Sequence, residues 1–156
     1  MKRMLGIVFS VVALGTLVAA VAAWAGSPSR HGGGAKPFTV IEHATTDATT
    51  DTGAPGDSAG DVLTFANEVF DRADAHQVGT DQGYCIRVVA GSSYECNWTT
   101  LLPGGQIVVE GPFYDAKDST LAITGGTGRY RKARGTMDLH SLEGGTKYAF
   151  TFHLNR

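Results

Sequence analysis

No acidic residue precedes Glu42, and the first aspartate is Asp47. Cysteine is scarce, with two residues, and the five histidines show no spacing to one another or to acids that is typical of metal ligands. No stretch combines the apolar period and the caps of a helix of three turns. We therefore expect no metal site, no bound cofactor and no helical domain.

The acid-free start of the chain has the form of an export signal. Lys2 and Arg3 supply positive charge, residues 4–23 form an apolar to weakly polar run, and Ala23-Trp24-Ala25 has the small-x-small pattern of a signal peptidase site. We predict a signal peptide over residues 1–25 and a secreted protein. The alternative is an uncleaved membrane anchor, because ~20 apolar residues can span a bilayer. Membrane contact would then be limited to this segment.

Charge and length limit the partners and the number of domains. Removal of residues 1–25 takes away two cations and no acid, so the formal net charge changes from −2 to −4. We therefore expect no nucleic-acid partner. Residues 26–37 are rich in Gly, Ser and Pro and predict a flexible linker. Residues 38–156 suffice for a single domain with one core.

The domain alternates apolar and polar residues with the period of β-strands, and turn residues recur at short intervals. Residues 45–60 are poor in large apolar side chains and predict a long loop between the first two strands. Strands are expected at 38–45, 61–70, 83–89, 94–101, 106–113, 120–124, 136–141 and 147–154. Eight short strands favour an all-β fold, an eight-stranded antiparallel up-and-down barrel, because closure removes exposed edges.

The two cysteines test this arrangement. A tight turn at Ala90-Gly91 would place Cys85 directly across a hairpin from Cys96, and an oxidising compartment would allow them to form a disulfide. Such a bridge would stabilise the domain by about 3 kcal/mol by constraining the unfolded chain. Its role would be structural.

Two polar residues stand on apolar strand faces. Glu42 shares a face with Phe38 and Val40, and Asn67 shares one with Leu63, Phe65 and Val69. If both faces point into the barrel, burial raises the pKa of Glu42, and Asn67 donates a hydrogen bond to it or to a ligand. An acid–base pair would result. The alternatives are a solvated Glu42 on the outer face or a salt bridge to Arg87.

The last strand carries Tyr148, Phe150, Phe152 and Leu154 on one face. Plain core packing is the more common use of such a stripe, because small barrels fill their interiors with side chains. A ligand wall is the other interpretation.

The segment Gly125-Gly126-Thr127-Gly128 does not predict a phosphate-binding loop. No Lys-Ser or Lys-Thr follows it, and no helix is expected to start there. We interpret it as a hairpin whose glycines adopt positive φ.

The order of short motifs resembles the allene oxide cyclase family and the related dirigent proteins. The motifs are Val40-Ile41-Glu42 followed by Asp47, Phe65-Ala66-Asn67, Gly83-Tyr84-Cys85, Gly111-Pro112-Phe113 and Leu121 to Gly128, and the continuation to Gly135 is closest to dirigent proteins. This resemblance implies an eight-stranded barrel around a hydrophobic cavity, with a trimer or dimer as the assembly. It also implies cyclisation, or stereochemical guidance, of a reactive apolar molecule by orientation and exclusion of water.

The resemblance also assigns roles to residues. Glu42 matches the glutamate near the reacting π system, and Asn67 matches an asparagine that helps to hold a water molecule at the epoxide, so both are expected to be catalytic. Phe65, Cys85 and Phe113 match positions that line the family's cavity. Together with Val40 and Tyr148 they are the expected contacts of a hydrophobic substrate. Phe113 replaces the family's tyrosine and Ala44 replaces an asparagine, so two polar groups are missing and a different substrate is expected.

Three functions follow as hypotheses. The first is an exported isomerase or cyclase, or a dirigent-like guide, that uses Glu42 and Asn67. The second is a non-catalytic carrier of a lipid-like ligand, which needs only the cavity. The third is a packed barrel with a structural role, which needs no cavity.

Overall fold

A computed structural model describes residues 35–155 of the chain. The expected signal peptide and most of the expected linker lie outside these residues. Within residues 35–155, no helix is long and apolar enough to cross a membrane.

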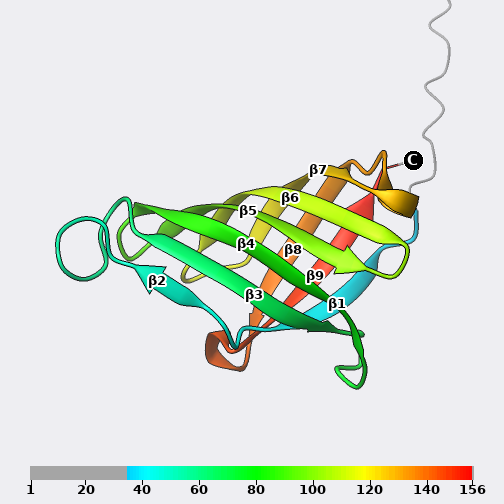
Figure 1. The fold of residues 1–156 in the computed structure, drawn as a ribbon, viewed down its shortest axis with the longest axis horizontal. Coiled ribbons are helices and arrows are strands. Elements are labelled where there is room, and N and C mark those ends of the chain that lie inside the picture. Colours follow the sequence, from blue (N-terminus) through cyan, green and yellow to red (C-terminus); the bar gives the residue numbers. More distant parts are fainter. Residues whose placement is uncertain (1–34, 156) are drawn as a thin grey trace, which may run out of the picture. The chain divides into compact units, whose positions relative to one another are not determined.

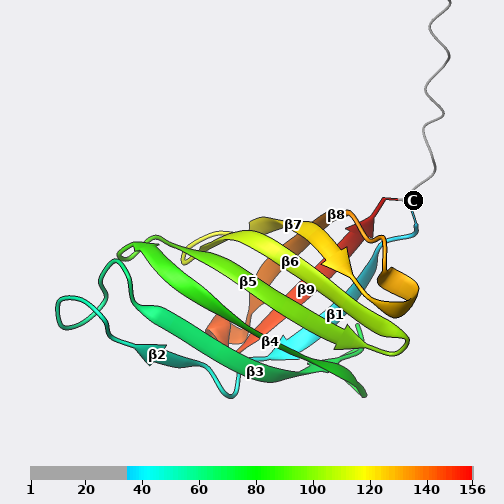
Figure 2. The same ribbon diagram turned by 45° about the horizontal axis from the view of Figure 1, so that its top comes forward.

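The domain is a closed antiparallel β-barrel of eight strands (Figures 1 and 2). The strands are β1 (Phe38–His43), β3 (Val62–Phe70), β4 (Gln77–Val89), β5 (Ser93–Leu102), β6 (Gly105–Tyr114), β7 (Ser119–Gly126), β8 (Gly135–Leu142) and β9 (Lys147–Leu154). Each of β3 to β8 pairs with the next strand in sequence. The barrel closes because β1 pairs with β9 along its length and with β3 at its C-terminal end. The predicted fold class is confirmed.

The segment predicted as a long loop contains a ninth strand, β2 (Ala48–Thr50). This strand pairs with Val62–Thr64 at the start of β3, whereas β1 pairs with the last three residues of β3 (Figure 1). The prediction of an uninterrupted loop was wrong here. A strand of three fully exposed residues leaves no alternation of apolar and polar side chains in the sequence.

Strand β4 begins at Gln77 rather than at the predicted Gly83. Its first half contains Gly79 and Gly83, which are uncommon inside strands. Both are close-approach positions, because a Cβ atom at Gly79 would lie 2.1 Å from the Leu101 carbonyl oxygen and one at Gly83 2.2 Å from the Trp98 Cβ. The glycines therefore mark tight packing against β5.

Cys85 and Cys96 are directly opposite in the β4–β5 ladder and form a disulfide, as predicted. The turn itself differs from the expectation. It contains Ala90, Gly91 and Ser92, with Gly91 at φ 64° and a register shift between Arg87 and Val89. The bulge absorbs the additional turn residue, so the register at the cysteines is unchanged.

The connection between β7 and β8 is not a tight hairpin of left-handed glycines. Gly125 and Gly126 still belong to β7 and pair with Val108 and Ile107. Only Gly128 of this segment has positive φ, at 55°, and it begins a single 3-10 turn that ends at Tyr130.

The barrel interior is a packed core toward one end and a chamber toward the other. The core is formed by inward-facing apolar side chains, of which the largest fully buried ones include Ile107, Leu121, Ile123, Met137, Phe150 and Phe152. Three segments surround the end of the barrel that holds the chamber: the β4–β5 turn, residues 115–118 and the 3-10 turn Glu143–Gly145. Core packing of the β9 stripe is thus confirmed for Phe150 and Phe152. Phe150 also lines the chamber, together with Tyr148.

Candidate active site: an acid in an aromatic chamber

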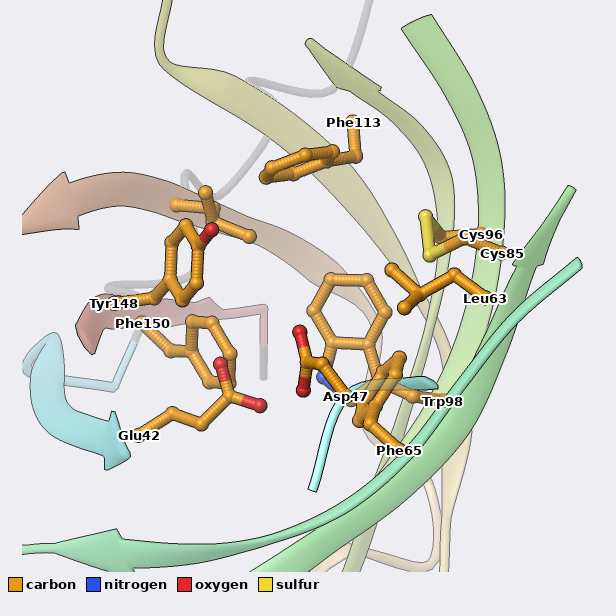
Figure 3. A pocket seen from close by; sticks show the side chains of 11 residues that line it. Glu42, Asp47, Leu63, Phe65, Cys85, Cys96, Trp98, Phe113, Tyr148 and Phe150 are labelled. Atoms are coloured by element: carbon orange, nitrogen blue, oxygen red, sulfur yellow. A yellow bond between two sulfur atoms is a disulfide. The ribbon is translucent and has the colours of Figure 1, made fainter. Parts of the chain in front are cut away.

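A chamber inside the barrel has one acidic side and mainly aromatic walls (Figure 3). The chamber has a volume of about 60 Å³. The lining residues are the acids Glu42 and Asp47, the aromatic residues Phe65, Trp98, Phe113, Tyr148 and Phe150, the aliphatic Leu63 and Leu139, and the disulfide Cys85–Cys96.

Glu42 points into the chamber and is 5% exposed. Its Oε1 accepts a 2.8 Å hydrogen bond from the Asn67 side-chain amide. Neither alternative to an inward Glu42 is correct. Arg87 instead forms ion pairs with Asp57, at 2.7 Å from Nε, and with Asp115, at 2.8 Å from Nη1.

Asn67 holds Glu42 and does not itself line the chamber. Its Nδ2 donates to Glu42 and, at 2.8 Å, to Asp47 Oδ1. Its Oδ1 accepts hydrogen bonds from the backbone N–H groups of Thr45 and Thr46 and from the Thr46 hydroxyl. Because both polar atoms are engaged within the protein, Asn67 fixes the orientation of the two acids and the turn that carries Asp47.

Burial governs the protonation of Glu42. Removal from water raises its pKa from an ordinary 4.5 to about 7, partly opposed by the Asn67 hydrogen bond and reinforced by the negative charge of Asp47. Asp81, on β4 behind Asn67, is 1% exposed. Burial, and then the charge of Glu42, raise the pKa of Asp81 to about 9. The acid in the chamber can therefore gain or lose a proton near neutral pH.

The aromatic walls are packed against one another. The ring centroids of Trp98 and Phe150 are 5.5 Å apart, and Phe65 meets Trp98 edge-on at 6.1 Å. Phe113 meets Tyr148 edge-on at 5.8 Å. Such contacts hold the rings in fixed orientations, so the chamber is preformed. Trp98 is 3% exposed, and within the described residues its Nε1–H has no hydrogen-bond acceptor.

A wider hollow of about 630 Å³ lies at the open end of the barrel. It shares Leu63, Phe113, Leu139 and Tyr148 with the chamber, so the two spaces adjoin. Arg87 lies at its edge, between Asp57 and Asp115, with its guanidinium carbon 3.6 Å from the centre of the Tyr94 ring. A molecule can therefore insert its reacting part in the chamber while the remainder occupies the mouth.

The structure brings together most of the residues that the sequence predicts. Glu42, Phe65, Cys85, Phe113 and Tyr148 line the chamber, and Asn67 lies directly behind Glu42. Val40 does not line it. Although Val40 faces inward, it lies one pleat repeat further along β1, where the packed core covers it. A substrate contact at Val40 stays a prediction.

Three residues were missed as site residues. Trp98 was treated only as part of a strand, yet it shares an inward face with Cys96, which could have located it. Asp47 belongs to a turn, so strand periodicity does not apply to it. Asp81 stands in the part of β4 that was not predicted as a strand.

No group of three or more His, Cys, Asp or Glu side chains within residues 35–155 is arranged to hold a metal ion. Glu42 and Asp47 are instead held by the amide of Asn67. The site is thus a pair of hydrogen-bonded acids at one side of a mainly apolar cavity.

Comparison with known proteins agrees with this architecture. The family model described as "Allene oxide cyclase barrel like domain" matches residues 41–154. The structure of a pyocyanin demethylase is 30% identical, with a TM-score of 0.63 over 74% of this chain and 98% of that chain. The pterocarpan synthase dirigent protein PsPTS1 is 15% identical, with a TM-score of 0.63 over 78% of this chain and 94% of that chain. AbnU, an exo-specific intermolecular Diels-Alderase, is 13% identical, with a TM-score of 0.62 over 78% of this chain and 100% of that chain.

The last two similarities concern the fold alone, whereas the family match covers almost all of the barrel. The described strands, the chamber and the matched range coincide. The chain belongs to the allene oxide cyclase barrel-like family.

Proposed function

We propose that this protein is an isomerase or cyclase that acts on a small, uncharged, conjugated molecule by acid–base catalysis. Glu42 is the group that transfers the proton, and the aromatic walls hold the substrate in one folded shape. The observation that carries the proposal is the single buried carboxyl that both faces the chamber and has its pKa raised to about 7. A general acid or base works best when its pKa is near the working pH.

The charge of the chamber limits the substrate. Of the described residues that line it, none is Lys, Arg or His, whereas Glu42 and Asp47 are acids. A carboxylate inserted in the chamber would meet repulsion with no cation there to compensate it. An uncharged ring system suits the aromatic walls. An oxygen atom on that ring system could accept a hydrogen bond from the buried Trp98 Nε1–H group.

The size of the site supports partial insertion of the substrate. The chamber admits little more than the reacting portion of a molecule, and the adjoining mouth accommodates the rest. Binding in the mouth then orients the inserted portion against Glu42 and excludes bulk water from it. Both effects accelerate reactions of unstable intermediates.

A second candidate is the reaction that names the 30% identical structure, the removal of a methyl group from pyocyanin. The identity extends over 98% of that chain, which favours a test of this substrate. Carriage of an apolar ligand without chemistry is the third candidate. It requires the chamber but not the raised pKa of Glu42.

One experiment separates the three candidates. The protein and its Glu42→Gln variant are incubated with pyocyanin and with a panel of uncharged quinone methides, conjugated dienes and epoxides, and products are identified by mass spectrometry. Product formed by the wild type and lost in the variant supports acid–base catalysis. Equal product in both proteins excludes a role for Glu42. An unchanged ligand that co-purifies with both proteins, without turnover of any compound, supports carriage.

Export and assembly belong to the same proposal. The disulfide Cys85–Cys96 supports maturation in an oxidising compartment. A mature N-terminus at Gly26 in the culture medium, measured by mass spectrometry, would support cleavage after Ala25, and retention of Trp24 in a membrane fraction would support an anchor. A homo-trimer or homo-dimer stays a prediction, which light scattering of the purified protein checks.

A further inference from the structure

Two buried carboxyl groups lie on either side of Asn67. Asp81 is its direct partner in the β3–β4 ladder, and Glu42 pairs with Val69, two residues further along β3. The Asn67 backbone N–H donates to Asp81 Oδ1 at 3.3 Å, and the Asn67 side chain donates to Glu42. The side chains of Glu42 and Asp81 are close enough for each to shift the pKa of the other, by its charge or its hydrogen-bonding position. The two acids therefore meet inside the barrel, and only Glu42 faces the chamber.

A hydrogen bond between two carboxyl groups requires a proton on one of them. Asp81 Oδ2 is buried, and no N–H or hydroxyl group of the described residues donates to it. An ionised Asp81 would leave this oxygen without a donor, which is costly in the interior. A protonated Asp81 resolves the difficulty, because Oδ2–H then donates to the Glu42 carboxylate.

The surrounding charges do not compensate a second negative charge. Two other titratable groups act on the pair: Asp47, from the turn after β1, and His43, from β1. Tyr148, from β9, is neutral, because burial and the charges of Asp47 and Glu42 raise the pKa of its hydroxyl. From β5, the residue opposite Asp81 is Thr100, which is uncharged. Of these groups only His43 can be positive, and its Nε2 is 2.6 Å from Asp74 Oδ1. Two carboxylates in contact at low dielectric cannot both ionise near neutral pH.

We propose that Glu42 and Asp81 share one proton at neutral pH, and that Asp81 is a positioning residue that keeps it behind the chamber wall. Glu42 is thereby left ionised toward the chamber, with a donor at its back. Below neutral pH both groups are protonated, and in alkaline solution both are ionised.

The use of this pair in catalysis rests on the proposed function. The Glu42 carboxylate removes a proton from a carbon or oxygen of the substrate, and the electron pair of the broken bond remains in the conjugated system of the substrate. Glu42 then returns the same proton to another atom of that molecule. No net proton is consumed, and Asp81 retains its own proton throughout.

The test is a titration of carboxyl carbons by NMR in the full chain, with ¹³C-labelled Asp and Glu side chains. We expect one buried carboxyl to titrate near neutral pH and a second in the alkaline range. Asp81→Asn keeps an acceptor for the Asn67 N–H and a donor for Glu42, and it should remove the alkaline step. In Glu42→Gln, Asp81 should titrate at least one pH unit lower than in the wild type, because the neighbouring charge is gone.

Titration of every carboxyl carbon below pH 5 would overturn the proposal, and so would an alkaline step that persists in Asp81→Asn. If Asp81→Asn does not fold, the test rests on the pH at which Asp81 titrates in Glu42→Gln. An Asp81 that titrates at the same pH as in the wild type overturns the proposal. Asp138, which is half-exposed and hydrogen-bonded to Thr120 on the outer wall, supplies the matched control as Asp138→Asn, which should leave both steps unchanged.

Activity separates this proposal from the proposed function. With a substrate in hand, the wild-type rate should decline in the alkaline range as Asp81 ionises, and Asp81→Asn should lack that decline while remaining active. Two NMR steps without any turnover would support the shared proton and contradict the proposed function. If turnover depends on Glu42 but all carboxyl groups titrate as exposed acids do, the proposed function is supported and the shared proton is contradicted.

Discussion

Gly83 lies directly opposite Trp98 in the β4–β5 ladder, and a Cβ atom at Gly83 would be 2.2 Å from the Trp98 Cβ. The missing side chain on β4 thus provides the space in which the indole stands inside the barrel. Chamber geometry therefore depends on a residue that does not itself line the chamber.

We predict that Gly83→Ala displaces Trp98 and destabilises the domain by about 1–3 kcal/mol, the usual cost of overpacking a core. Trp98 fluorescence should shift at the same time, and a Trp24→Phe background removes the other tryptophan of the chain. Gly125→Ala is the matched control, because a Cβ atom at Gly125 would have no neighbouring atom within 4 Å. Equal stability and equal emission spectra for the two variants would contradict the expected clash.

Stability should decrease as the pH rises from about 5 to 9. The pKa values of Glu42 and Asp81 are raised in the folded state, so the folded chain retains protons that the unfolded chain has already released. Each such proton contributes up to about 1.4 kcal/mol per pH unit in favour of unfolding as the pH rises. Melting temperatures measured by circular dichroism should fall over this range, and the slope should be smaller in Asp81→Asn. Parallel slopes in the two proteins would contradict the assignment.

On the acid side the sign is reversed. Backbone N–H donors from Thr52 and Ser58 lower the pKa of Asp61, and the hydrogen bond from Lys147 lowers that of Asp74. These groups stabilise the fold above an ordinary pKa near 3.8 and lose that contribution as the pH falls further. The melting temperature should therefore pass through a maximum in weakly acidic solution, and a continuous rise down to pH 2 would be inconsistent with these contacts.

Loss of the disulfide should cost about 3 kcal/mol in unfolding free energy, since Cys85 and Cys96 close a loop with a sequence separation of 11. The paired substitution Cys85→Ala with Cys96→Ala should match the reduced wild type in urea unfolding. If reduction leaves the unfolding midpoint unchanged, the disulfide has no stabilising role.

Arg87 connects two loops at the mouth of the barrel through Asp57 and Asp115. Its guanidinium is almost fully buried, and Arg87→Ala would leave both acids without their cation, so we expect a loss of about 2 kcal/mol. Lys117→Ala is the control, since that ammonium group only lies over the Tyr114 ring. Urea unfolding measures the free energy of unfolding of both variants. Similar losses in the two variants would show that the burial of Arg87 is unimportant.

The barrel fold could be predicted from the sequence because the alternation of apolar and polar residues recurs in eight segments. Glu42 and Asn67 could be predicted as a pair because each interrupts an apolar face, and the structure joins them at 2.8 Å. The cysteine register was also accessible, because the bulge lies between the cysteines and the turn and leaves their pairing intact.

The remaining features depend on contacts between distant segments. Asp81 stands between Thr80 and Gln82 in a stretch that resembles a turn, and only its pairing with Asn67 shows that it faces inward. The turn with Asp47 is held by hydrogen bonds from Thr45 and Thr46 to Asn67, which no local pattern predicts. Val40 has the same alternation as Glu42, and the sequence could not indicate where along β1 the chamber ends and the core begins.

The most direct test is the single-turnover rate of Glu42→Gln at pH 7 with a confirmed substrate, with occupancy of the chamber followed by quenching of Trp98 fluorescence in the Trp24→Phe background. General acid–base catalysis contributes about 10²- to 10⁴-fold, so we predict a rate reduced by at least about 100-fold. The dissociation constant should stay within about threefold of the wild-type value, because glutamine preserves the shape of the site. An unchanged rate at equal occupancy would contradict the account.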